Sequence, residues 1–89
     1  MDEYVVVGVT DGSYTGKDGR FHKGLRFFLQ GTKALVSRDE AEYASEGYST
    51  SNIWIANGVV SEAGFIPSVG DKISLFYNRY GSVSGYKPV

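Results

Sequence analysis

The sequence contains no cysteine, two prolines and one histidine among its 89 residues. Without cysteine it has no disulfide framework, no thiol nucleophile and no thiolate ligand for a metal. His22 alone cannot form a site that needs several histidines, and Asp18 is the only nearby carboxylate in the sequence that is placed to orient it. We therefore expect no metal site and no catalysis by cysteine or histidine.

Phosphate-binding and paired-carboxylate motifs are missing as well. No Gly-x-Gly-x-x-Gly occurs, and Gly16-Lys17 is followed by an aspartate instead of the hydroxyl residue of a phosphate loop. The acidic side chains within residues 39–46 fit a solvated helix face better than a metal site or an acid–base pair. We expect that the protein is not an enzyme and binds no cofactor.

Long apolar runs are also lacking. No run approaches the roughly 20 residues that a membrane-spanning helix needs. The acidic start Met1-Asp2-Glu3 does not have the form of a signal peptide. We expect a cytoplasmic protein that does not associate with membranes.

Glycine is plentiful instead, with 12 residues, and 42% of the chain is hydrophobic. Many glycines in a short chain favour many turns and therefore mostly β structure. The length suits a single domain, which we expect to cover residues 1–89.

Apolar patterns predict the strands. Tyr4 to Val9 is a β-branched run without helical periodicity, and residues 25–30 alternate apolar and polar side chains, with Leu25, Phe27 and Leu29 facing the core. A tight turn is expected at residues 30–32. The remaining strands are predicted at residues 33–36, 50–56, 59–60, 69–77 and 82–86.

One short helix is predicted at about residues 38–46. Ser37 and Glu40 match a capping box, and Gly47 is placed to end the helix. The order is then three strands, a helix, and two or three strands. This order fits a small five- to six-stranded OB-like barrel, in which a helix lies between strands three and four.

The net charge of −1 conceals a strong segregation of charge. Residues 14–36 carry five cations against one acid, and residues 63–89 carry three against one. Residues 1–13 and 37–62 are acidic. If the two basic segments share a face, they form a phosphate-binding surface without a basic pI.

The strongest local signal is a basic, aromatic hairpin at about residues 14–24. The turn Lys17-Asp18-Gly19-Arg20 suits a type I′ turn, which needs positive φ angles. Cations and rings close together suit a single-stranded nucleic acid, because cations follow phosphates and rings stack on bases. An ordinary solvated hairpin with its rings turned into the core is the alternative.

Two further positions extend this surface. Arg26 and Phe28 lie on the face of their strand opposite to the core residues, either in a packed patch or on a binding platform. Trp54, the only tryptophan, is either a stacking platform or a structural side chain.

The size, the basic hairpin after the first strand and the closing segment of residues 69–83 resemble the small single-stranded DNA-binding proteins of filamentous phages and related mobile elements, the gene V type. The resemblance implies an OB-like barrel that forms a homodimer and coats single strands during phage or plasmid replication, in the cytoplasm of a bacterial host. It also implies a projecting wing at residues 14–24. The nucleic-acid-binding residues expected from the pattern and the resemblance together are Tyr14, Lys17, Arg20, Phe21, Lys23, Arg26, Phe28, Arg79 and Tyr80.

The leading hypothesis is therefore a protein that binds single-stranded DNA, or RNA in its place. The alternative is a small phage-type inhibitor or regulator, similar to anti-CRISPR proteins, whose acidic helix docks on a host nucleic-acid enzyme. A third reading is a structural component whose hairpin adds a strand to the sheet of a neighbour.

Overall fold

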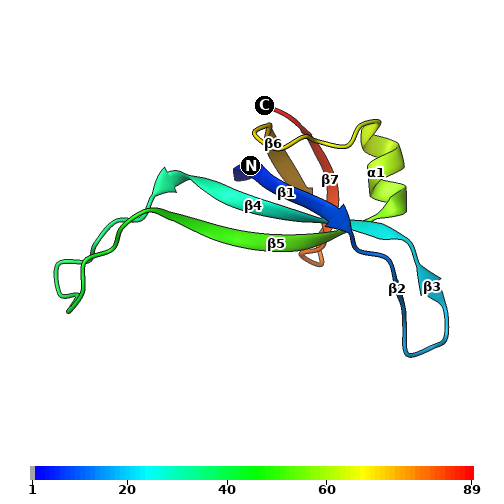
Figure 1. The fold of residues 1–89 in the computed structure, drawn as a ribbon, viewed down its shortest axis with the longest axis horizontal. Coiled ribbons are helices and arrows are strands. Elements are labelled where there is room, and N and C mark those ends of the chain that lie inside the picture. Colours follow the sequence, from blue (N-terminus) through cyan, green and yellow to red (C-terminus); the bar gives the residue numbers. More distant parts are fainter. Residues whose placement is uncertain (1) are drawn as a thin grey trace.

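The computed structural model describes residues 2–89 and shows a mainly β protein with one short helix (Figure 1). A five-stranded antiparallel sheet is accompanied by a separate two-stranded one. The elements are β1 (Asp2–Asp11), β2 (Tyr14–Thr15), β3 (Phe21–His22), β4 (Gly24–Ala34), β5 (Tyr48–Ala56), α1 (Asn57–Ala63), β6 (Lys72–Tyr77) and β7 (Val83–Pro88).

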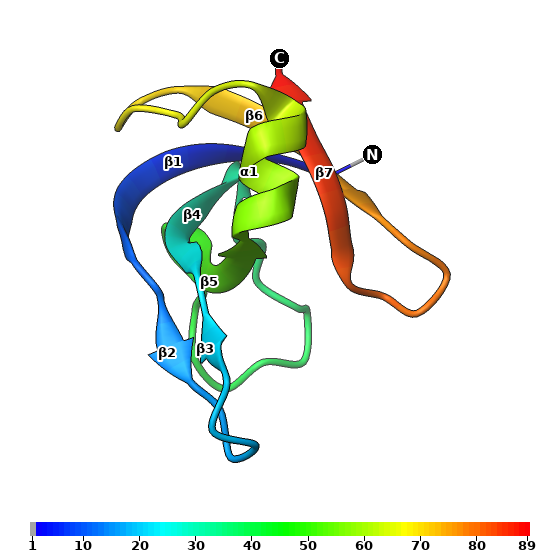
Figure 2. The same ribbon diagram turned by 90° about the vertical axis from the view of Figure 1, so that its right-hand side faces the viewer.

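The large sheet has the strand order β5-β4-β1-β6-β7, so β1 lies at its centre and β5 and β7 are its edges. The sheet is strongly curved, and α1 stands across one end of the curve (Figure 2). The helix contacts β7, β5 and β4. Within residues 2–89 the two edge strands do not pair, so the sheet does not close into a barrel.

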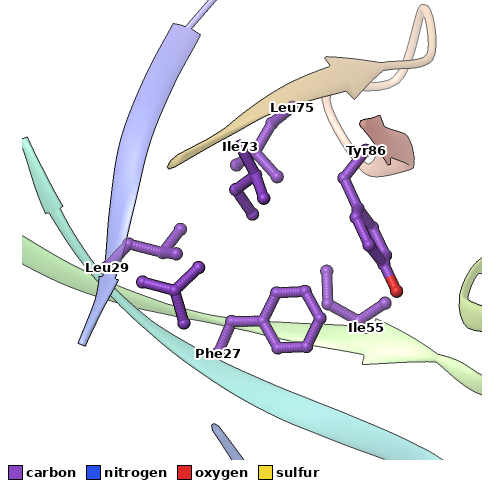
Figure 3. Packing of buried hydrophobic residues seen from close by; sticks show 7 residues of the cluster. Phe27, Leu29, Ile55, Ile73, Leu75 and Tyr86 are labelled. Carbon is purple, nitrogen blue, oxygen red and sulfur yellow. The ribbon is translucent and has the colours of Figure 1, made fainter. Parts of the chain in front are cut away.

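The core fills the concave side of this sheet (Figure 3). Phe27 packs edge-to-face against Tyr86 with ring centroids 5.2 Å apart, and Phe65 packs on the same tyrosine at 5.2 Å. The expected core positions Phe27 and Leu29 are fully buried, and Leu25 packs against them. The buried hydrophobic residues are Val6, Phe27, Leu29, Ile55, Ile73, Leu75 and Tyr86.

A β-bulge in β1 decides which side chains reach the core. Val6 pairs with Leu29 and Gly8 with Phe28, so Val7 is the extra residue and is exposed. Because one added residue reverses the alternation of faces, Val6 points into the core while Gly8 lies on the opposite face. The uniform apolar run of this strand does not reveal the bulge.

The predicted turn at residues 30–32 is wrong. β4 runs without interruption from Gly24 to Ala34, so it includes Lys33 and Ala34 of the separate strand expected at residues 33–36, and residues 35–36 belong to no strand. Its register with β5 shifts between Gln30 and Ala34, so an irregularity in the pairing takes the place of the turn. The true reversal of direction lies beyond Ala34.

The predicted helix at residues 38–46 is also wrong, because this segment is a loop. The hydroxyl of Ser37 accepts a hydrogen bond from the amide of Ser45 (2.7 Å) instead of capping a helix, and the amide of Leu35 donates to the carbonyl of Gly47 (2.7 Å). Short helices depend on packing for stability. Here every side chain is exposed except the half-buried Ala41, so nothing supports a helix.

The helix forms instead at Asn57–Ala63, where the sequence predicted a turn and a strand. Val59, Val60 and Ala63 pack against the core from one side of it, as in an amphipathic helix. Gly64 ends the helix with a φ of 80°, and its amide donates to the carbonyl of Val60. A helix between the third and fourth long strands is therefore present, but it is a different segment from the one predicted.

The other strands and the hairpin follow the prediction more closely. Strands predicted at residues 4–9, 25–30 and 50–56 are confirmed, and β6 and β7 overlap the two predicted at the end of the chain. The hairpin turn is not type I′, since only Gly19 has a positive φ (77°). No helix within residues 2–89 has the length and apolar character needed to cross a membrane.

Replacing Tyr86 by phenylalanine is expected to lower the free energy of unfolding by about 1 kcal/mol, because the Tyr86 hydroxyl donates to the half-buried carbonyl of Phe65. Burial also raises the pKa of Tyr86 above its ordinary value of 10.0. The folded state therefore keeps this contribution below about pH 10 and loses it as the pH rises through the higher folded pKa.

Urea unfolding at about pH 7 to 11 measures both effects. The variant is expected to be less stable at neutral pH and to lose less stability above about pH 10 than the wild type. If the free energies of unfolding of the wild type and the variant differed by the same amount at every pH, this role of Tyr86 would be contradicted.

Candidate nucleic-acid interface

The convex side of the sheet, here called the outer face, carries the polar and aromatic residues of β1, β4 and β5. Side chains of directly paired residues in an antiparallel sheet share one face. Three such rows cross β1, β4 and β5: Thr10–Arg26–Trp54, Gly8–Phe28–Asn52 and Val5–Gln30–Thr50. Lys72 of β6 pairs with Val5 and so extends the last of these rows.

Phe28 lies on the outer face above Gly8. A Cβ atom at Gly8 would be 3.3 Å from the Phe28 ring, so the absence of a side chain there lets the ring lie close to β1. The ring remains 39% exposed, a large fraction for phenylalanine on a sheet. This position offers one free aromatic surface to a ligand.

Arg26 lies in the neighbouring row and is half-buried. Its Nη1 donates a hydrogen bond of 2.7 Å to Oδ1 of Asn52. A guanidinium has five N–H donors, so this contact orients the group and leaves further donors for a phosphate.

Trp54 is held against two glycines at the root of the hairpin. Its indole Nε1 donates to the carbonyl of Gly12 at 2.8 Å. Cβ atoms added at Gly12 and Gly24 would lie 2.9 Å and 2.6 Å from the indole ring, so both positions must stay free of side chains. The indole thereby fastens the start and the end of the hairpin to β5.

The aromatic row continues from Trp54 into the hairpin. The Tyr14 ring meets the indole edge-on, with centroids 5.6 Å apart. On its other side Tyr14 stacks with His22 at 4.9 Å and an interplanar angle of 23°. Phe28, Arg26, Trp54, Tyr14 and His22 together form one band, here called the aromatic track.

The cations of the hairpin lie at its tip and at its root. Lys17 and Arg20 are exposed at the tip, where the Asp18 carboxylate accepts the amide of Arg20 at 3.0 Å and lies 4.0 Å from its guanidinium. At the root, the pKa of Asp11 is lowered, first by a hydrogen bond from the Ser13 amide and to a smaller extent by Lys23.

Three predicted site residues lie away from the track. Phe21 pairs with Thr15, so it is on the face of the β2–β3 ribbon opposite to Tyr14, and it is 68% exposed. Arg79 and Tyr80 contact each other in a cation–π arrangement at 5.0 Å in the turn between β6 and β7. That turn projects to the right in Figure 2, whereas the hairpin points to the bottom, so the two lie apart.

The structure adds three residues to the predicted binding set. Trp54, which the sequence left open as a stacking platform or a structural side chain, joins the hairpin to the sheet. His22 extends the track, and Asn52 orients Arg26. Asn52 and Trp54 alternate with the core residues Ile53 and Ile55, so the sequence indicates that Asn52 and Trp54 share one face of β5. Their hydrogen-bond partners, Arg26 and Gly12, lie 26 and 42 residues away in the sequence and could not be predicted from it.

Comparison with protein-family models, with curated proteins and with solved structures finds no match for this chain. Among residues 2–89 no group of three or more histidine, cysteine, aspartate or glutamate side chains is placed to hold a metal ion.

Gly24→Ala is expected to displace the indole, because the new Cβ would lie 2.6 Å from both the Trp54 ring and the carbonyl of Ile55. We expect a loss of about 1–3 kcal/mol in the free energy of unfolding, the usual cost of overpacking. Denaturation experiments and the emission maximum of the only tryptophan measure both changes.

Gly58→Ala is the matched control. Nothing lies within 4 Å of a Cβ at this position in α1, so alanine is expected to stabilise the protein slightly and to leave the emission of Trp54 unchanged. Equal effects of the two substitutions would contradict the packing of the Trp54 indole against Gly24.

Proposed function

We propose that this protein binds single-stranded nucleic acid, with DNA as its ligand, across the outer face of β4 and β5 and along the hairpin. The observation that carries the proposal is the aromatic track. It places exposed rings and an oriented guanidinium in one continuous band, with the cations of the hairpin beside it.

The chemistry favours a single strand over a duplex. Bases stack on aromatic side chains only when their faces are free, which a single strand allows, and each stack contributes about 1–3 kcal/mol. Phe28 presents such a face, and Tyr14, which is 48% exposed, lies in the same band, while Arg26, Lys17 and Arg20 supply positive charge for phosphates. Affinity then depends strongly on salt, because each neutralised phosphate releases counterions.

The arrangement of the long strands supports an OB-like reading of the sheet. Counted as one to five, β1, β4, β5, β6 and β7 place the helix between the third and the fourth. In OB folds the face of strands two and three, together with the loops after strands one and four, binds oligonucleotides. Here these parts are the outer face of β4–β5, the β2–β3 hairpin and the turn that holds Arg79 and Tyr80.

The biological setting is proposed from the resemblance to gene V-type proteins. It comprises binding of single strands as a homodimer during phage or plasmid replication in a bacterial cytoplasm. The same resemblance is the reason for proposing DNA as the ligand. Each titration should therefore include an RNA oligonucleotide of the same length for comparison.

Titration with a short single-stranded oligonucleotide is expected to quench the fluorescence of Trp54, with affinity falling steeply between about 0.05 and 0.2 M salt. Phe28→Ala is expected to weaken binding about 5- to 100-fold through loss of a stacking platform. Arg26→Ala is expected to lower the magnitude of the slope of log affinity against log salt concentration by about one, because one phosphate contact is lost.

Lys87→Ala is the control, since Lys87 is a cation that lies on the edge strand β7, away from the aromatic track. This variant is expected to bind like the wild type. An absence of quenching at either salt would end the proposal and leave a host protein as the partner, to be sought by a pull-down from the host.

A further inference from the structure

The loop between β4 and β5 carries apolar side chains that remain exposed in the structure of residues 2–89. Residues 35–48, here called the acidic arm, expose Leu35, Val36, Tyr43 and Tyr48, with Val36 at 83% and Tyr43 at 80%. The arm is shaped by hydrogen bonds of its own and buries no side chain. Exposed apolar side chains gathered on one projecting segment are typical of an interaction surface.

The charge of the arm indicates what kind of surface it meets. One arginine, Arg38, stands against the four acids Asp39, Glu40, Glu42 and Glu46, which leaves the arm with a charge of −3. The hairpin at residues 14–24 has the opposite charge of +2, from three cations against Asp18. Both segments also present exposed rings, Tyr43 on the arm and Phe21 on the hairpin.

These two segments cannot meet within one molecule. They lie at opposite ends of the longest axis, along which the chain extends 48 Å (Figure 1). Two copies placed head to tail bring the arm of one onto the hairpin of the next. Such a contact joins different patches of the two partners, so it is heterologous and propagates into chains or rings.

We propose that the acidic arm is a self-assembly surface that docks on the basic hairpin of a second copy. Tyr43 and Val36 supply the apolar contact, and Glu40 and Glu42 face the cations Lys17 and Arg20. The contact is independent of nucleic acid, but it uses the hairpin to which the proposed function assigns nucleic acid. An oligonucleotide therefore competes with the acidic arm for the hairpin and dissociates the assembly.

A charge exchange tests the docking directly. Sedimentation velocity of the wild type at about 50 mM salt is expected to show association that grows with concentration and disappears at about 0.5 M salt. The double variants Glu40→Lys/Glu42→Lys and Lys17→Glu/Arg20→Glu each remove attraction from one side of the contact. Each alone is expected to weaken association about tenfold or more.

Mixing the two variants restores opposite charges across the contact, so association is expected to return. Glu3→Lys/Glu62→Lys makes the same change in net charge at exposed sites off the arm and is expected to associate like the wild type. Circular dichroism checks that all variants fold.

Two results would overturn the proposal: a wild type that stays monomeric at about millimolar concentration and low salt, or association that survives both charge reversals. The measurements contain no nucleic acid, so a negative result leaves the proposed binding of single strands standing, although a monomeric wild type would contradict its homodimeric form. In the same way, a failure to bind oligonucleotides leaves the docking of the arm standing.

Discussion

The hydrogen bond from the Trp54 indole to the carbonyl of Gly12 joins the two parts of the molecule that make up the proposed interface. One part is the curved sheet, whose core holds the outer face rigidly in place. The other is the β2–β3 hairpin, which has too few residues to be stable by itself. Because Gly12 and Gly24 leave room for the indole, the hairpin continues the sheet and Tyr14 lies beside Trp54. The aromatic track depends on this packing of the Trp54 indole against Gly12 and Gly24.

The sequence predicted the strands well where local patterns determine them, and it misplaced the helix because tertiary packing determines that. Leu25, Phe27 and Leu29 alternate with polar residues, so their strand and its buried face could be read directly. Ser37 and Glu40 satisfy a local rule for helix starts, but no core lies against that segment. Val59 and Val60 look like a strand in isolation and form a helix because they cover the end of the sheet.

The candidate site was predictable in part for a similar reason. Arg26 and Phe28 follow from alternation, and the hairpin follows from its turn residues and charges. The contacts that make a track of them, from Trp54 to Gly12 and from Asn52 to Arg26, join residues distant in the sequence. The segregation of charge was also evident, but only the fold shows that the acidic arm and the basic hairpin occupy opposite ends of the molecule. A net charge near zero therefore describes a strongly polar molecule.

The most direct test of the central claim is an NMR titration of the ¹⁵N-labelled protein with an unlabelled single-stranded oligonucleotide. The amide signals of β4, β5 and the hairpin, and the indole N–H of Trp54, are expected to shift together. Those of α1 and β7 are expected to stay in place. Shifts confined to α1 and β7, or none at saturating oligonucleotide, would contradict the assignment of the outer face as a nucleic-acid interface.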